Sequence, residues 1–371
     1  MTPIWRRFTD RGGLVNLDDL TKRQGAWLHG DGPESDVVIS SRIRLARNIK
    51  GFPFVSHANS TDLKAIEQTA VDAVTSVLPE NTFACLDFHA ISRDDAMFLQ
   101  ERQMVSADFA ENVIPRSLVM AQDESYSIMI NEEDHLRIQT VASGLVLKEL
   151  WEKTNKLDDL IESKLDYAFD EGYGYLTACP SNVGTGLRAS VMMHLPALIE
   201  TDEMAKVMRS LEKMNFEVRG MYGEGSRALG ELFQVSNQKT LGVTEEQIVE
   251  QLSDVIPCIL NYERMAREEL LEKNRDGLLD RCHRALGTLQ SARLTSMEEA
   301  MKFLSSIRLG VRMGLFKDVS VELVNELLMN IQPVHLRKLA QMRGDGSNDD
   351  ASLRARYIRE RLAGLGSKDE L

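Results

Sequence analysis

Short segments of alternating apolar and polar residues run from about residue 35 to residue 240 of the chain. Such alternation is typical of strands with one buried face, whereas apolar residues three or four positions apart are typical of helices. The alternation predicts strands at residues 37–45, 126–131, 135–141, 175–179 and 232–235. Between them, helices are predicted at residues 60–78, 142–156, 187–198 and 201–214. Strands mixed with helices and joined by short connections predict an α/β (α+β) layered domain.

The pattern becomes helical throughout after Gly242. Thr244 and Gln247 have the spacing of a capping box, which predicts the start of a helix. Pro257 is expected to kink or interrupt this helix, because proline lacks the N–H donor and clashes with the preceding turn. Further helices are predicted at residues 277–290, 296–307, 320–330 and 351–362. A mixed α/β part is therefore followed by a helical part.

The composition is that of an ordinary globular protein, with 43% hydrophobic and 27% charged residues among 371. No apolar run approaches the roughly 20 residues that span a bilayer, and residues 1–13 lack the hydrophobic stretch of a secretory signal. The last four residues spell an endoplasmic-reticulum retention signal, which without a secretory signal is a chance match. Four cysteines without CxxC spacing fit a reducing cytoplasm rather than a disulfide framework or a zinc ribbon. A net charge of −13 repels nucleic acid and anionic membranes, so binding to either is not expected.

The first motif with chemical content is Ser40-Ser41-Arg42-Ile43-Arg44. In a strand, Arg42 and Arg44 project from one face while Ile43 covers the other. Two guanidinium groups on one face repel each other unless an anion lies between them, and their planar forks suit phosphate oxygens. The alternative is a solvated edge strand with surface arginines.

A second cluster covers residues 131–137, with the sequence NEEDHLR. If this segment is extended, Glu133, His135 and Arg137 share a face, and Glu132 and Asp134 lie opposite. A carboxylate beside an arginine could orient a cationic substrate while the arginine holds an anionic one. An acidic turn and a divalent-metal site are the alternatives.

Glycine-rich segments form the third and fourth motifs, at residues 179–188 (CPSNVGTGLR) and 219–226 (RGMYGEGS). Glycines at 184 and 186, before the helix predicted from residue 187, would let backbone N–H groups approach an anion. Cys179 is either a partly ionised thiol or a buried cysteine without a catalytic role. The fourth segment is either a loop that closes over a ligand, carrying Glu224, or a plain connector.

In this order, the four motifs resemble the catalytic domain of the phosphagen kinase family, which includes creatine and arginine kinases. The resemblance implies an antiparallel sheet flanked by helices. A short leader and a helical C-terminal extension are similar to the branch of this family that phosphorylates arginine in proteins. The expected division is a leader at 1–35, a catalytic domain at 36–268, a C-terminal helical domain at 269–342, and a linker, charged helix and tail at 343–371.

The resemblance also implies the roles of individual residues. Arg42, Arg44, Arg137, Arg188 and Arg219 match the arginines that bind the nucleotide phosphates. Glu133 and Glu224 match the carboxylates that grip the guanidinium, with Glu133 as the base, and Cys179 matches the reactive cysteine. The residues expected at the nucleotide are Ser40, Ser41, Arg42, Ile43, Arg44, Arg137, Arg188, Ala189, Ser190, Val191, Met192, Arg219, Gly220, Met221, Tyr222, Gly223 and Glu224.

The expected cofactors are ATP and Mg²⁺, with the metal held through ATP rather than by a protein site. The implied activity is phosphorylation of exposed arginines in proteins, marking them for Clp proteolysis in stress regulation. A zinc-binding activator of the McsA type and a Clp ATPase are implied partners, and the C-terminal helices could form a homodimer interface or cap a bundle. The alternatives are a kinase for free arginine or another small guanidino compound, and a catalytically silent adaptor that binds client proteins.

Two departures from the family pattern affect these expectations. Gln103 stands where the protein-phosphorylating branch has a histidine that contacts nucleotide. Near the C-terminus, that branch has an Arg-Asp-x-x-Arg-Ala motif that binds phosphoarginine allosterically. Here Asp350 and Ala351 occupy its first two positions, and only Arg354 and Ala355 remain. An aspartate would repel phosphate, so this allosteric pocket is expected to be weak or absent.

Overall fold

The computed structural model describes residues 17–220, 228–344 and 349–366. Within them, eight strands form one antiparallel sheet in the order β2-β3-β4-β5-β1-β8-β10-β9. The strands are β1 Val38–Arg47, β2 Phe83–Asp87, β3 Ser117–Ala121, β4 Tyr126–Ile130, β5 Leu136–Ser143, β8 Leu187–His194, β9 Phe216–Gly220 and β10 Leu232–Asn237. A separate small hairpin pairs β6 Phe169–Asp170 with β7 Gly174–Tyr175. The antiparallel sheet implied by the resemblance is confirmed.

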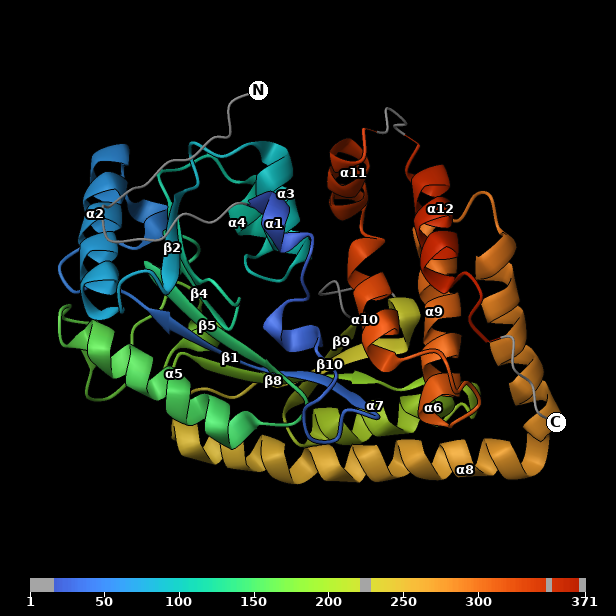
Figure 1. Ribbon diagram of the computed structural model, residues 1–371. Helices are drawn as coiled ribbons and strands as arrows, with labels where there is room; N and C mark the ends of the chain where they lie inside the picture. The colour runs from blue at the N-terminus through green and yellow to red at the C-terminus, as the bar shows by residue number, and fades with distance from the viewer. Residues whose placement is uncertain (1–16, 221–227, 345–348, 367–371) are drawn as a thin grey trace.

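Helices cover one face of this sheet and bury its apolar side chains (Figure 1). They are α2 Ser60–Val77, α5 Leu147–Glu162, α7 Met204–Lys213 and the first half of the long helix α8 Glu245–Ser291. Ile43 and Leu45 of β1 and Ala189 and Val191 of β8 point into this core and are almost fully buried. The alternation of β1 therefore leaves its arginines on the opposite face.

The remaining helices gather in two places (Figure 1). Near the β2 side of the sheet lie α1 Leu17–Leu20, α3 Arg93–Glu101 and α4 Ala107–Glu111. The short helix α6 Pro196–Glu200 directly follows β8. The C-terminal group contains α9 Met297–Arg312, α10 Val321–Asn330, α11 Pro333–Met342 and α12 Asp350–Leu362, which pack with the second half of α8. The helical C-terminal region is confirmed, and α8 runs through residues 268 and 269, the expected domain boundary. No helix in the described ranges has the length and apolar character needed to cross a membrane.

Three local predictions are wrong. Residues 187–194 form a strand, not a helix, because this apolar segment pairs on both sides, with β1 and β10. Residues 176–179 lie outside any strand, since only Gly174–Tyr175 pairs. Helix α8 continues through the exposed Pro257, because Ile256 and Ile259 anchor it in the core on either side; its non-helical residue is Asn274. The capping box of Thr244 and Gln247 is confirmed.

Candidate active site

The five arginines of the sequence motifs project from the same face of the sheet. Arg44 of β1 lies directly opposite Arg188 of β8, and cross-strand partners place their side chains on the same face. Arg137 of β5 lies two residues from Gln139, the other partner of Arg44, and so shares this face. Gln234 of β10 pairs with Met192 of β8 on one side and with Arg219 of β9 on the other. The same face of the sheet therefore continues from β8 through β10 to β9.

We call this group of residues, Arg42, Arg44, Arg137, Arg188 and Arg219, the arginine cradle. Strand β1, which carries Arg42 and Arg44, is flanked by β5 and β8. The alternative that this segment is a solvated edge strand is therefore wrong. Strands far apart in the sequence therefore bring together the side chains that the motifs singled out.

Positive charge in the arginine cradle is incompletely compensated by the part of the chain that the structure describes. Burial, followed by the charges of Arg137 and Arg188, lowers the pKa of Arg42 to about 10. The pKa of Arg44 lies well below its usual value, again through burial first and then through neighbouring guanidinium groups. The Nε atoms of Arg44 and Arg188 are buried without a hydrogen-bond acceptor among the described residues. Such a surface favours a polyanionic ligand, which would supply both acceptors and charge.

Gln103, the residue that departs from the family pattern, lies at this site. Its Oε1 atom accepts a hydrogen bond of 3.4 Å from Nη1 of Arg42, and Gln234 accepts another from Nη2. The backbone oxygen of Gln103 accepts from Nε2 of Gln139 at 2.7 Å. The glutamine thus orients one guanidinium of the arginine cradle without neutralising it.

The acidic motif forms a turn, not an extended strand. Asn131 donates its backbone N–H to the oxygen of His135 at 3.0 Å, which closes the connection between β4 and β5. The turn brings Glu132, rather than Glu133, onto Arg137, whose Nη1 lies 2.8 Å from both carboxylate oxygens. Burial alone would lower the pKa of Arg137, but the carboxylates of Glu132, Glu133 and Asp134 together outweigh burial and raise that pKa. The metal-site alternative gains no support, because the described residues contain no metal-binding group of three or more His, Cys, Asp or Glu side chains.

Glu133 is exposed at the tip of this turn, beside the arginine cradle. Partial burial of its carboxyl, and then the negative charges of Asp134 and Glu132, raise its pKa, while Arg137 and a hydrogen bond with Cys179 oppose that shift. Cys179 is half-buried, and its Sγ lies 3.0 Å from Oγ of Ser181. The expected reactive cysteine thus lies near enough to the expected base to affect its pKa.

A buried pair to which the sequence analysis assigned no role, Asn48 and Asp134, holds these two segments together. Oδ1 of Asp134 accepts hydrogen bonds from Nδ2 of Asn48 at 2.6 Å and from the backbone N–H of Ala178 at 2.7 Å. Nδ2 of Asn48 also donates to the oxygen of Leu176 at 2.9 Å. The loop before Cys179 is therefore fixed against the turn that carries Glu133, through contacts that local sequence patterns do not reveal.

A second overlooked residue, Glu217 of β9, lies inside the arginine cradle. Its Oε1 lies 2.6 Å from Nη2 of Arg219, and its Oε2 pairs with Nη2 of Arg188. These two arginines hold the pKa of Glu217 below its usual value despite partial burial. A signal was present in the sequence, since Glu217 and Arg219 are two residues apart in a strand and so share a face.

The glycines of the third motif have a structural role different from the expected one. Gly186 has a positive φ of 63°, and a Cβ there would lie 2.6 Å from the oxygen of Ala46; at Gly184 it would lie 2.3 Å from the oxygen of Thr240. They permit close backbone packing next to a strand, rather than an anion site at a helix start. In the fourth motif, Met221, Tyr222, Gly223 and Glu224 lie outside the described residues.

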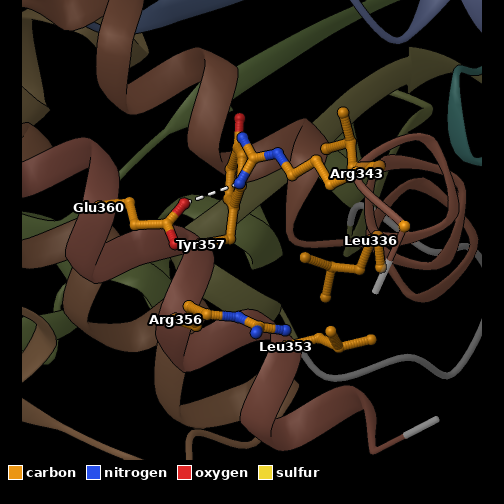
Figure 2. A pocket seen from close by; sticks show the side chains of 9 residues that line it. Leu336, Arg343, Leu353, Arg356, Tyr357 and Glu360 are labelled. Atoms are coloured by element: carbon orange, nitrogen blue, oxygen red, sulfur yellow. Dashed lines mark hydrogen bonds and ion pairs between the residues drawn. The ribbon is translucent and has the colours of Figure 1, made fainter. Parts of the chain in front are cut away.

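Arg354 and Ala355 lie in the C-terminal helices, away from the arginine cradle. Arg354 is buried and donates to the backbone oxygens of Ile331 at 3.0 Å and Thr295 at 2.9 Å. A nearby hollow of about 420 Å³ opens between α11 and α12 (Figure 2). Arg343 and Glu360 form an ion pair of 2.7 Å at its rim. Arg354 is thus committed to backbone carbonyls, and it does not line this hollow.

An antiparallel sheet with guanidinium groups on one face and an acidic turn beside them meets the requirement of a guanidino kinase, a place for a polyanion next to a place for a cation. Residues 65–266 match the family model of the ATP:guanido phosphotransferase C-terminal catalytic domain, and residues 275–371 match that of the protein-arginine kinase McsB C-terminal domain. The chain belongs to the ATP:guanido phosphotransferase family, and within that family to the protein-arginine kinases.

Individual relatives agree with this assignment. The chain is 41% identical to the protein-arginine kinase of Symbiobacterium thermophilum, over 93% of this chain and 98% of that protein. It is 45% identical to the protein-arginine kinase of Halalkalibacterium halodurans, over 91% of this chain and 94% of that protein. A solved structure of the duplicated taurocyamine kinase from Schistosoma mansoni, with bound transition state analog components, has a TM-score of 0.57 at 23% identity, covering 66% of this chain and 35% of that one. The last comparison supports the fold alone.

Proposed function

We propose that this protein transfers the γ-phosphate of ATP to the guanidinium groups of arginine residues in proteins. The single observation that carries the proposal is the arginine cradle, in which buried N–H groups of Arg44 and Arg188 lack acceptors among the described residues, beside the acidic turn of Glu133. The relatives named protein-arginine kinase support the choice of acceptor.

The arginine cradle is proposed to hold the phosphates of ATP, together with the backbone and side chains of the motif residues around it. Fixed positive charges stabilise the charge that develops on the departing ADP, and arginine is not consumed in doing so. Mg²⁺ commonly binds through substrate phosphates and keeps several waters, so we propose that it enters with ATP.

Glu133 is proposed to be the base, with Glu224 as the second carboxylate that grips the acceptor. A guanidinium is protonated at neutral pH and is a poor nucleophile. In the transfer, one arginine nitrogen forms a bond to the γ-phosphorus, the bond from that phosphorus to the ADP oxygen breaks, and the nitrogen's proton passes to Glu133. The raised pKa of Glu133 favours this proton uptake, since a base acts best when its pKa lies near the working pH. We propose that Cys179 orients the Glu133 carboxylate.

The experiment that tests the proposal compares acceptors. The purified protein is incubated with Mg²⁺ and ATP, with either casein or free arginine, and products are analysed by mass spectrometry at neutral pH because phosphoarginine is acid-labile. We expect phosphoarginine in casein, and a loss of at least about 100-fold in rate for Glu133→Gln, the usual size of a general-base effect. The exposed Glu171→Gln serves as the matched control and should retain full activity.

Other outcomes would replace the proposal. Turnover on free arginine alone would favour a small-substrate guanidino kinase. Absence of acid-labile phosphate on either acceptor would favour a silent client-binding adaptor.

Further aspects of the proposal concern the cellular setting. We propose a cytoplasmic location, clients destined for a Clp protease in stress regulation, and an activator of the McsA-like zinc-binding type. A homodimer through the C-terminal helices is also proposed. Size-exclusion chromatography with light scattering tests the dimer, and stimulation of casein phosphorylation by a candidate activator tests the partner.

A further inference from the structure

Glu217 places a carboxylate where the arginine cradle would bind phosphate. Its two oxygens contact different arginines, Oε1 with Arg219 at 2.6 Å and Oε2 with Arg188. Arg188 also donates from Nη2 to Oγ of Ser236 at 2.9 Å. A carboxylate that bridges two guanidinium groups imitates the way in which phosphate oxygens would bridge them.

Glu132, the carboxylate that pairs with Arg137 of the arginine cradle, is held differently. Its side chain is only 5% exposed, and besides Arg137 it accepts hydrogen bonds from Oγ of Ser106 at 2.7 Å and from the backbone N–H of Glu133 at 3.0 Å. These neutral donors keep Glu132 in place whatever happens at Arg137. Glu132 is therefore part of the framework of the turn.

Glu217 lacks such anchors among the described residues, where its side chain contacts only Arg188 and Arg219. The side chain is 20% exposed and belongs to β9, the last strand of the sheet order. A partly exposed carboxylate on an outer strand has a path into solvent. Rotation would release both guanidinium groups to an incoming ligand.

We propose that Glu217 is an internal stand-in for nucleotide phosphate, which keeps Arg188 and Arg219 ordered in the free protein and must leave them when the nucleotide binds. The inference rests on the proposed nucleotide role of the arginine cradle. Its consequence is that Glu217 lowers nucleotide affinity, because phosphate and carboxylate compete for the same two cations. Faster release of ADP after each turnover follows from the same competition.

The test is the binding of ADP and of ATP with Mg²⁺ to Glu217→Gln, measured by titration calorimetry without an acceptor protein. Glutamine keeps the size and removes the charge. Glu212→Gln is the matched control, because Glu212 is exposed near the end of α7 and its substitution changes net charge equally. We expect at least about fivefold tighter binding of both nucleotides to Glu217→Gln, the lower end of common coupling effects, and no change in the control.

Steady-state kinetics on casein provide a second readout. We expect KM for ATP to fall in Glu217→Gln while KM for casein stays unchanged. Weaker or unchanged nucleotide binding in an active Glu217→Gln protein would overturn the inference and leave the proposed function standing, because Glu217 would then orient the arginines or be neutral. A rise only in KM for casein would also overturn it, by assigning Glu217 to the acceptor. Absence of nucleotide binding in wild type and variant alike would overturn both the inference and the proposed function.

Discussion

Arg44 of β1 and Arg188 of β8 are direct cross-strand partners at the centre of the sheet, and the Nε atom of each is buried without an acceptor among the described residues. Like charges directly opposite in a sheet are destabilising. The pair therefore lowers the stability of the free protein, and the polyanion of the proposed function would offset its repulsion.

Arg44→Met should lower activity without lowering stability. Removing one fixed positive charge from the site should lower kcat/KM for ATP by about 100-fold or more, as for the loss of one donor to a developing charge. Because burial and neighbouring arginines already disfavour this cation, the free energy of unfolding should stay the same or rise. Kinetics and urea denaturation measure the two effects. Loss of stability together with activity would contradict this separation of roles.

Arg47→Met, on the same strand, should behave in the opposite way. Nη2 of Arg47 lies 2.7 Å from Oδ2 of Asp158, and Nη1 donates to the oxygen of Thr185 at 2.9 Å, with only 1% of the side chain exposed. Its loss leaves a buried carboxylate without its cation, so the free energy of unfolding should fall by about 3–5 kcal/mol. Urea denaturation of the Arg47→Met, Asp158→Asn double variant is the control, and it should be less affected than the sum of the single changes.

The pH dependence of activity should report on Glu133. Burial and then the charges of Asp134 and Glu132 raise its pKa, and a base must be deprotonated to act, so kcat/KM should fall as pH drops through that raised pKa. Asp134→Asn removes one negative neighbour, which should shift this acidic limb to lower pH. The asparagine oxygen can still accept the bonds from Asn48 and Ala178. An acidic limb that stays in place, or moves to higher pH, would argue against Glu133 as the base.

Gly186→Ala tests the structural role assigned to the third motif. With a φ of 63° and the Ala46 oxygen 2.6 Å from the added Cβ, the substitution should destabilise the protein by about 1–3 kcal/mol. Gly287→Ala in α8 is the control, since an added Cβ there meets nothing within 4 Å; it should stabilise by roughly 0.5–1 kcal/mol. Thermal unfolding of both variants checks the contrast. Equal effects would show that the backbone at residue 186 can adjust.

The sequence alone determined which face of β1 carries charge. Side chains alternate along any strand, so Arg42 and Arg44 had to share one face and Ile43 the other, whatever the neighbouring strands were. The capping box at Thr244 was equally local, because its two hydrogen bonds join residues three positions apart.

Only the tertiary structure decided what depends on distant partners. Residues 187–194 were predicted to be helical, and pairing with β1 and β10 makes them a strand. The contact of Glu132 with Arg137 depends on the turn between β4 and β5. An extended conformation of residues 131–137 would place these two side chains on opposite faces. The bond from Ala178 to Asp134 joins residues 44 positions apart, and Glu217 reaches Arg188 across β10. Alternation is a property of the backbone itself, whereas these contacts exist only after strand order and register have been set by burial of the whole sheet.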